Sequence, residues 1–168
     1  MNKKKELTVE RLRELLSFNP ITGELVFNST GSVKVPSEEG YIEIYDKQLK
    51  KNHKLKADKL CWALVHGTRP RKGQYILHKD FNEHNNKLNN LLLVSRLVYF
   101  QLKEAYRNMT SGIKITPHET DQFTYVVSWY SGNILHKKTI GDLILARRFM
   151  VKLQLKYSKI LTKYCLFE

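Results

Sequence analysis

Two short apolar runs separated by an asparagine-rich loop constrain the fold of this chain most strongly. Residues 75–78 end in a histidine, and residues 91–95 form the second run. Each run has the length of a strand and is too short for a typical helix. Asparagine accepts turn dihedrals and both donates and accepts hydrogen bonds, which suits the loop between them. Helical spacing follows over residues 97–106, so we predict a ββα unit over 75–107.

The residues before this unit predict a small segment of mixed helix and strand. Thr8 is a candidate N-cap for an amphipathic helix, and the Pro and Gly of the following segment indicate a turn. Alternating apolar residues predict a hairpin farther on. The predicted elements are, in order, a helix over 8–17, a turn over 19–23, a strand over 24–27, a loop over 31–40, hairpin strands over 41–45 and 49–55, a helix over 57–66 and a basic loop over 68–73.

A polar break at residues 108–112 marks the predicted boundary between two domains, 1–108 and 109–168. Beyond it we predict strands over 113–116, 123–130 and 134–140 and a long helix over 143–164. The polar side of that helix is basic, with Arg147, Arg148, Lys152, Lys156 and Lys159. The predicted fold class is therefore α+β.

The charge of the chain predicts a polyanionic partner. Lys and Arg number 29 against 16 Asp and Glu, which gives a formal net charge of +13, and the excess is spread over both predicted domains. Such an excess costs self-repulsion unless an anionic surface offsets it. Nucleic acid fits this requirement, while an acidic protein or lipid surface, or a basic protein without such a partner, is the alternative.

Cysteine usage and hydropathy predict a cytoplasmic protein. Cys61 and Cys165 lie far apart in the sequence, each among apolar residues, which is typical of reduced, buried thiols. No apolar stretch approaches the roughly 20 residues that span a bilayer, and no signal-peptide pattern is present. We therefore expect no membrane partner.

Several motifs in a fixed order carry a family resemblance. They are Phe-Asn-Pro-Ile-Thr-Gly-Glu-Leu-Val-Phe at 18–27, Gly40-Tyr41, the segment 57–67 with Pro70, then His78, Asn86-Lys87-Leu88 and Asn90-Leu91. In this order and spacing, residues 6–107 resemble phage-type HNH homing endonucleases. Residues 111–160 resemble the AP2-type DNA-binding domain that accompanies such modules, with 111–113, the aromatic strand, Ile140-Gly141 and Ala146 as anchors. An unrelated small α+β domain is the alternative for this second half.

The resemblance implies a metal-dependent nuclease site, which this chain departs from. In such a site a histidine activates water, an asparagine orients the histidine, and one divalent ion holds the scissile phosphate. His78 matches the general base and Asn90 the orienting asparagine, with Asn86 as a further orienting or vestigial residue. Leu77 and Tyr99 take the positions of the two metal ligands.

Neither of those two residues suits a hard divalent ion, because leucine has no lone pair and a neutral phenol is a poor ligand. Asp80, two residues past His78, is a weak candidate for a replacement ligand, as are Glu83 and His84; the alternative is that all three are solvated loop residues. His78, Asn86 and Asn90 can equally be structural residues of the loop. We attach no chemistry to Asp58, which stands where relatives often have histidine. We expect no cofactor, and Mg²⁺ or Mn²⁺ only if the site is active.

The AP2 resemblance implies that the C-terminal sheet lies in the major groove of DNA, which admits such an element and distinguishes its base pairs. One face of the sheet would contact DNA, while Phe123, Tyr125, Val127 and Trp129 would pack on the helix; the opposite phase remains an alternative. The candidates on the DNA face are Lys114, Thr116, Thr124, Ser128, Tyr130 and Lys138. Candidates for phosphate contacts are Lys3, Lys4, Lys5, Lys50, Lys51, Lys54, Arg69, Arg71 and Lys72.

Three functions follow from these observations. The first is a protein that binds double-stranded DNA, descended from a phage homing endonuclease, which no longer cuts by the ordinary route. The second is a working endonuclease with displaced metal ligands and His78 as its base. The third is a scaffold or inhibitor that binds a protein or ribonucleoprotein and uses the fold only as a surface.

Overall fold

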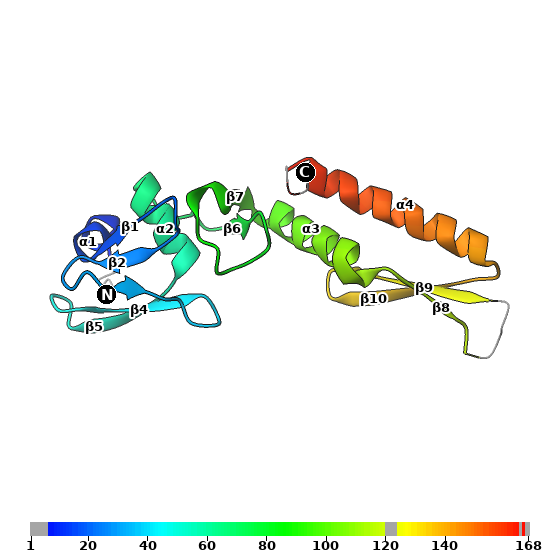
Figure 1. Ribbon diagram of the computed structural model, residues 1–168, viewed down its shortest axis with the longest axis horizontal. Helices are drawn as coiled ribbons and strands as arrows, with labels where there is room; N and C mark the ends of the chain where they lie inside the picture. Colours follow the sequence, from blue (N-terminus) through cyan, green and yellow to red (C-terminus); the bar gives the residue numbers. More distant parts are fainter. Residues whose placement is uncertain (1–6, 120–123, 165, 167–168) are drawn as a thin grey trace. The chain divides into compact units, whose positions relative to one another are not determined.

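The protein is α+β, with four α-helices and several small antiparallel sheets among the residues described. The computed structural model describes residues 7–119, 124–164 and 166, without the side chains of 111 and 112 (Figure 1). It contains two compact units, Met1–Ser95 and Arg96–Glu168. The division lies earlier than the sequence predicts, because helix α3 (Arg96–Arg107) groups with the C-terminal unit.

The N-terminal unit consists of small sheets and two helices around one core. Its elements are α1 (Val9–Leu15), β1 (Leu16–Phe18), β2 (Leu25–Phe27), β3 (Val33–Lys34), β4 (Tyr41–Asp46), β5 (Lys51–Lys56), α2 (Ala57–His66), β6 (Gln74–His78) and β7 (Leu91–Ser95). Strands β1, β2 and β3 form one sheet, and β4–β5 and β6–β7 form two antiparallel pairs. The predicted first helix is shorter than expected because Leu16 leaves it in an extended conformation, with φ −134° and ψ 141°.

Local chemistry explains the ends of both helices. Thr8 caps α1 as predicted, and its Oγ1 accepts the main-chain N–H of Arg11 at 3.2 Å. Gly67 ends α2 in the left-handed region, with φ +69°, and donates its N–H to the carbonyl oxygen of Ala63.

The core of the unit is a single cluster of apolar side chains, Leu7, Leu12, Leu16, Leu25, Ile42, Ile44, Ala57, Leu60, Cys61, Ile76 and Leu91. Cys61 is buried as predicted, whereas Cys165 lies outside the described residues.

An ion pair joins the first helix to the β4–β5 hairpin. Arg11 donates from Nε to Asp46 Oδ2 at 3.1 Å and from Nη2 to Asp46 Oδ1 at 3.0 Å. The Asp46 side chain is 0% exposed and also accepts the main-chain N–H groups of Gln48 and Leu49. The hydrogen bonds from Arg11 lower the pKa of Asp46 to about 2, even though burial acts in the opposite direction. The Asp46 carboxylate thus closes the hairpin turn, and its lowered pKa favours the ionised form in the folded protein.

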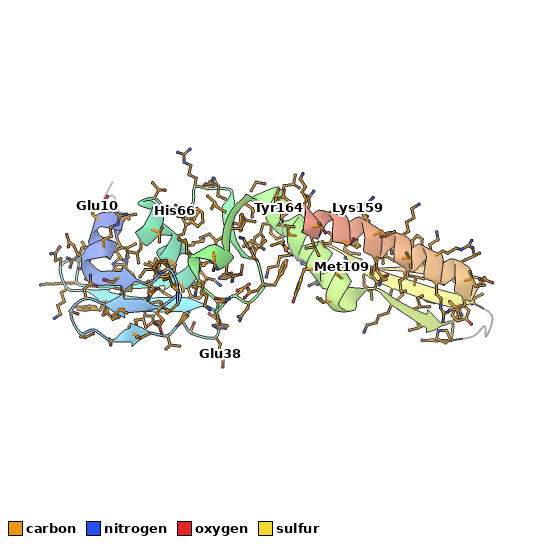
Figure 2. All side chains as sticks on the ribbon, turned by 45° about the horizontal axis from the view of Figure 1, so that its top comes forward. Glu10, Glu38, His66, Met109, Lys159 and Tyr164 are labelled. Carbon is orange, nitrogen blue, oxygen red and sulfur yellow. The ribbon has the colours of Figure 1, made fainter. Side chains whose placement is uncertain are left out.

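The C-terminal unit is a three-stranded antiparallel sheet with two helices. After α3 and a short π-helical turn, Asn108–Gly112, come β8 (Lys114–Pro117), β9 (Tyr125–Ser131), β10 (Ile134–Ile140) and α4 (Leu143–Thr162). The strand order is β10–β9–β8, and α4 lies along one face of this sheet (Figure 1). The predicted three strands and long helix are confirmed, and Asp142 caps α4 by accepting the N–H of Leu145 at 2.9 Å. Basic side chains project from α4 beside the labelled Lys159 (Figure 2).

Buried hydrogen bonds tie α3 to the central strand of this sheet. Asn108 is 2% exposed, and its side chain pairs with the main chain of Tyr130: Oδ1 accepts the N–H at 2.8 Å and Nδ2 donates to the carbonyl oxygen at 2.8 Å. Glu104 accepts the N–H of Gly132 at 2.9 Å and the Tyr157 hydroxyl at 3.3 Å. Burial, with the nearby Glu104 carboxylate, raises the pKa of Tyr157 to about 12. These contacts explain why α3 belongs to the C-terminal unit.

Candidate functional site

His78 lies at the end of β6 and is buried, with 6% of its surface exposed. Its Nε2 lies 3.1 Å from Oδ1 of Asn86. Because an amide oxygen can only accept, Nε2 is the donor in this hydrogen bond. The sequence predicts that Asn90 orients this histidine; the structure gives that contact to Asn86.

Asn90 instead holds the loop through Asp80. Its Nδ2 donates to Asp80 Oδ1 at 2.9 Å and to the carbonyl oxygen of Asn85 at 2.7 Å, and its Oδ1 accepts the N–H of Asp80 at 3.1 Å. Asp80 also accepts from Asn85 Nδ2 at 2.7 Å and from the N–H of Asn82 at 2.9 Å. Partial burial alone would raise the pKa of Asp80, but these hydrogen bonds, with those of Asn85 and Asn90 strongest, lower it below its ordinary value. The asparagine-rich loop is therefore built around one carboxylate.

The turn at residues 19–23 supports the same loop from outside. Pro20 accepts the N–H of Leu88 at 3.0 Å. A Cβ at Gly23, whose φ is +82°, would lie 2.7 Å from the main-chain nitrogen of Lys87 and 2.9 Å from the carbonyl carbon of Asn86. The turn therefore positions Asn86 against His78, a role that the turn chemistry of the sequence does not reveal.

Two further residues near His78 were assigned no role from the sequence. Phe81 has φ +59°, which is strained for an aromatic residue, and donates its N–H to the carbonyl oxygen of His78 at 2.9 Å. Asp58 is on the first turn of α2, and burial raises the pKa of its carboxyl against the opposing effects of the Lys59 N–H and the charge of His78. An acidic residue in a predicted helix was visible in the sequence, but its proximity to the histidine was not.

The side chains at this site do not fit a divalent ion. Leu77 is 1% exposed and faces Leu92 across the β6–β7 pair, so it is a core residue. Asp80 uses three of its acceptor positions on Asn82, Asn85 and Asn90. Tyr99 lies on α3, and its phenol is a poor ligand for such an ion. Within the described part of the chain, no three His, Cys, Asp or Glu side chains are grouped as metal ligands would be.

The C-terminal sheet has one packed face and one open face. Val127 is fully buried, and Trp129 packs edge-to-face on Phe149 of α4, with ring centroids 5.5 Å apart. The predicted packed face is thus confirmed for Val127 and Trp129; Phe123 lies outside the described residues. The residues between these positions point away from α4. We call Lys114, Thr116, Ser128, Lys137 and Thr139 the open face.

The register across the three strands brings the open face together. Lys114 and Lys137 both pair with Ser128 from its two sides, and Thr116 and Thr139 both pair with Val126. Residues directly opposite one another in a sheet share a face, so these side chains form two rows across the sheet. All of Lys114, Thr116, Lys137 and Thr139 are exposed.

One residue predicted for this face lies on the other side. Lys138 pairs with the buried Val127, and its ammonium group is 4.5 Å from the centroid of the Phe149 ring. Lys137 takes its place on the open face. The alternation within β10 alone does not determine which face Lys138 occupies. The register of β10 against β9 determines it, and a shift of one residue exchanges the two faces.

The remaining candidates for DNA contact have varied surroundings. Tyr130 is partly covered, since the Arg107 guanidinium lies 4.8 Å from its ring centroid, and Thr124 is half-buried. Arg71 and Lys72 are exposed in the basic loop. Arg69 donates from Nη2 to the carbonyl oxygen of Leu7, which anchors its guanidinium. Lys3, Lys4 and Lys5 lie outside the described residues.

No protein family, curated protein or solved structure matches this chain in the comparisons made. Among the described helices, none combines the length and the apolar composition that a bilayer span requires.

Proposed function

We propose that this chain is a double-stranded DNA-binding protein, related to phage-type HNH endonucleases, that does not cut DNA by the ordinary metal-dependent route. The observation that carries the proposal is the open face of the C-terminal sheet. Two lysines flank a central serine there, with threonines beside them, on a face that α4 does not cover. Hydroxyl and ammonium groups are the donors that contact phosphates and base edges in a groove.

The net charge of +13 supports the same partner. Long-range attraction of a polyanion speeds its association, and each phosphate contact releases a counterion. Basic residues of the exposed side of α4, which include Arg147, Lys152 and Lys159, extend the positive field of this unit.

The surroundings of His78 support the absence of ordinary cleavage. The position before the histidine is a core leucine, and the loop carboxylate two residues after the histidine, Asp80, holds three asparagine groups in place. His78 itself is bonded to Asn86 in an arrangement that also serves the stability of the loop. The site retains a base and its orienting amide without a set of ligands for the ion.

Neighbouring lysines on opposite faces of β10 provide the test of DNA binding. Binding of a fluorescently labelled duplex is followed by anisotropy over a range of salt concentrations. We expect Lys137→Ala to weaken binding several-fold at low salt and to lower the salt slope by about 1, because it removes one phosphate contact. Lys138→Ala removes the same charge from the packed face and serves as the matched control. It should leave the dependence of affinity on salt concentration unchanged. Equal effects of the two substitutions, or none, would contradict the proposal and favour a protein or ribonucleoprotein partner.

The same preparations test the catalytic half of the proposal. Supercoiled plasmid incubated with the protein and Mg²⁺ or Mn²⁺ should remain intact. Cleavage that His78→Ala abolishes would show a working endonuclease and overturn the inactive assignment, whatever the result for binding.

A further inference from the structure

A basic pocket with an aromatic wall lies in the N-terminal unit, beside β4 and β5. It has a volume of about 380 Å³ and is lined by Tyr41, Lys54, Lys56, Lys59, Arg69 and Pro70, with Leu55 and Leu60. We call it the Tyr41 pocket. The lining residues come from β4, β5, the first turn of α2 and the basic loop after it, so the fold brings together four segments here.

The charge of the lining is unbalanced. Four of the residues are cationic, and among the described residues no acidic side chain lines the pocket. Two carboxylates lie nearby: Glu39 is 3.5 Å from the Lys54 ammonium, and Glu83 is 3.5 Å from that of Lys56. Both carboxylates are exposed to solvent, and ion pairs of this kind are weak in water. Like charges gathered in a hollow repel one another, which favours an anionic occupant.

Parts of the pocket are held in place before any ligand arrives. Lys56 donates from Nζ to the carbonyl oxygen of Glu39 at 2.8 Å and to Oε2 of Glu83 at 3.5 Å, which leaves one of its three donors for a further acceptor. Arg69 is anchored by its bond to the Leu7 carbonyl oxygen. An anion would therefore meet cations whose side-chain freedom is already reduced.

Tyr41 gives the pocket a second kind of contact. The ammonium groups of Lys54 and Lys56 each lie 4.9 Å from the centroid of its ring. A cation–π contact at an exposed site is weaker than a charge-assisted hydrogen bond to a phosphate. A phosphate in the pocket would draw the Lys54 ammonium away from the ring, while Lys56 stays bonded to Glu39. This leaves a ring face for a nucleobase, and all four bases can stack on an aromatic side chain.

We propose that the Tyr41 pocket binds one unpaired nucleotide of a DNA strand, with its phosphate on the lysines and Arg69 and its base on Tyr41. This inference rests on the proposed function in DNA binding and adds a preference for DNA that carries a single-stranded segment. A base in an intact duplex is stacked on its neighbours and must leave the stack to reach the Tyr41 ring, whereas an unpaired base at an end or gap reaches it without that cost.

The test compares two DNA probes on the full-length protein. One is a blunt duplex, and the other is the same duplex with a short single-stranded thymidine tail; anisotropy gives the affinity of each. We expect the tail to raise the affinity of the wild-type protein. Tyr41→Leu should remove that gain, a loss of about tenfold for one stacked base, and leave the affinity for the blunt duplex unchanged. Tyr41→Phe should keep the gain.

Tyr45→Leu is the matched control, because Tyr45 is 55% exposed, lies on the same strand face and does not line the pocket. Lys59→Ala provides a second test that does not touch the β-hairpin; it should also reduce the gain from the tail, while Lys47→Ala in the hairpin turn should not. A Tyr41→Leu variant that loses affinity equally for both probes, or for neither, overturns the inference.

Competitors distinguish a nucleotide site from a simple phosphate site. Thymidine monophosphate should compete with the tailed probe at lower concentration than inorganic phosphate does; equal competition would overturn the role of Tyr41. Failure of the proposed function would give a different result. The blunt duplex would then bind weakly, and Lys137→Ala would not change its affinity. The effect of the single-stranded tail on affinity could still be measured.

Discussion

Gly23 links two parts of the N-terminal unit that are far apart in the sequence. It belongs to the turn at residues 19–23, and its Cα faces the main chain of Asn86 and Lys87. Its φ of +82° is in the region that favours glycine. A side chain here would have to displace backbone rather than a flexible group, so the position of Asn86 against His78 depends on this contact.

We expect Gly23→Ala to destabilise the protein by about 2–4 kcal/mol, because it combines an unfavourable φ with a backbone clash. Gly31→Ala is the control: φ there is +66°, and a Cβ would have no neighbour within 4 Å. It should cost only the backbone term, about 1 kcal/mol. Urea unfolding measures both. Equal losses for the two variants would show that the contact with the loop contributes nothing.

The contacts of His78 show what single residues in a sequence can and cannot predict. His78 at the end of a strand and an asparagine loop after it were predicted and are observed. The sequence did not predict that Asn86, and not Asn90, bonds to His78. Both asparagines lie in one loop, and the turns between them determine which one reaches the histidine. Asp80 determines those turns by gathering the amides of Asn85 and Asn90.

At the scale of elements, Asn108 determines where α3 belongs. Its side chain occupies the main-chain N–H and carbonyl of Tyr130 and also donates to the carbonyl oxygen of Glu104 at 3.0 Å. These are hydrogen bonds of the kind that an added strand would make, formed by one buried amide. The end of α3 is therefore fixed to the middle strand of the C-terminal sheet.

We expect Asn108→Ala to destabilise the C-terminal unit by about 1–3 kcal/mol, because it removes the acceptor of the Tyr130 N–H and leaves the Tyr130 carbonyl oxygen with the Tyr157 hydroxyl as its donor. Gln101→Ala removes an exposed amide from the same helix and should change the free energy of unfolding little. Trp129 reports on this unit and Trp62 on the other, so unfolding is followed by fluorescence in a Trp62→Phe background. A loss as small as that of Gln101→Ala would contradict the role given to Asn108.

Sequence periodicity predicted most elements but not their grouping. The helix at residues 96–107 was visible from its spacing, and its order after two strands suggested a ββα unit. A buried asparagine just beyond its end ties it to a strand that follows later in the chain. The face of Lys138 was mistaken for a related reason, since it depends on the register between two strands rather than on either strand alone.

At the scale of the whole molecule, the response to acid should differ between the two units. In the N-terminal unit, folding lowers the pKa of Asp46 and of Asp80. Asp58 acts in the opposite direction, because burial raises its pKa. In the described part of the C-terminal unit, the resolved shift is that of Tyr157, which titrates far above neutral pH. The carboxylates whose ionised form stabilises folding thus lie in one unit.

A group with a lowered pKa stabilises the folded state fully above its unfolded pKa and loses that contribution as the pH falls through its folded pKa. For Asp46 the window runs from its ordinary value of 3.8 down to about 2. Protonation of carboxylates also raises the positive charge of the whole chain, which adds repulsion in both units.

We therefore expect Trp62 fluorescence to report unfolding at a higher pH than Trp129 fluorescence, each measured with the other tryptophan replaced by phenylalanine. Asp46→Asn should be less stable at neutral pH but should flatten the pH dependence of the Trp62 transition within that window. Coincident transitions of the two reporters, with an unchanged profile in Asp46→Asn, would assign acid unfolding to the net charge of the chain instead of to the Arg11–Asp46 pair.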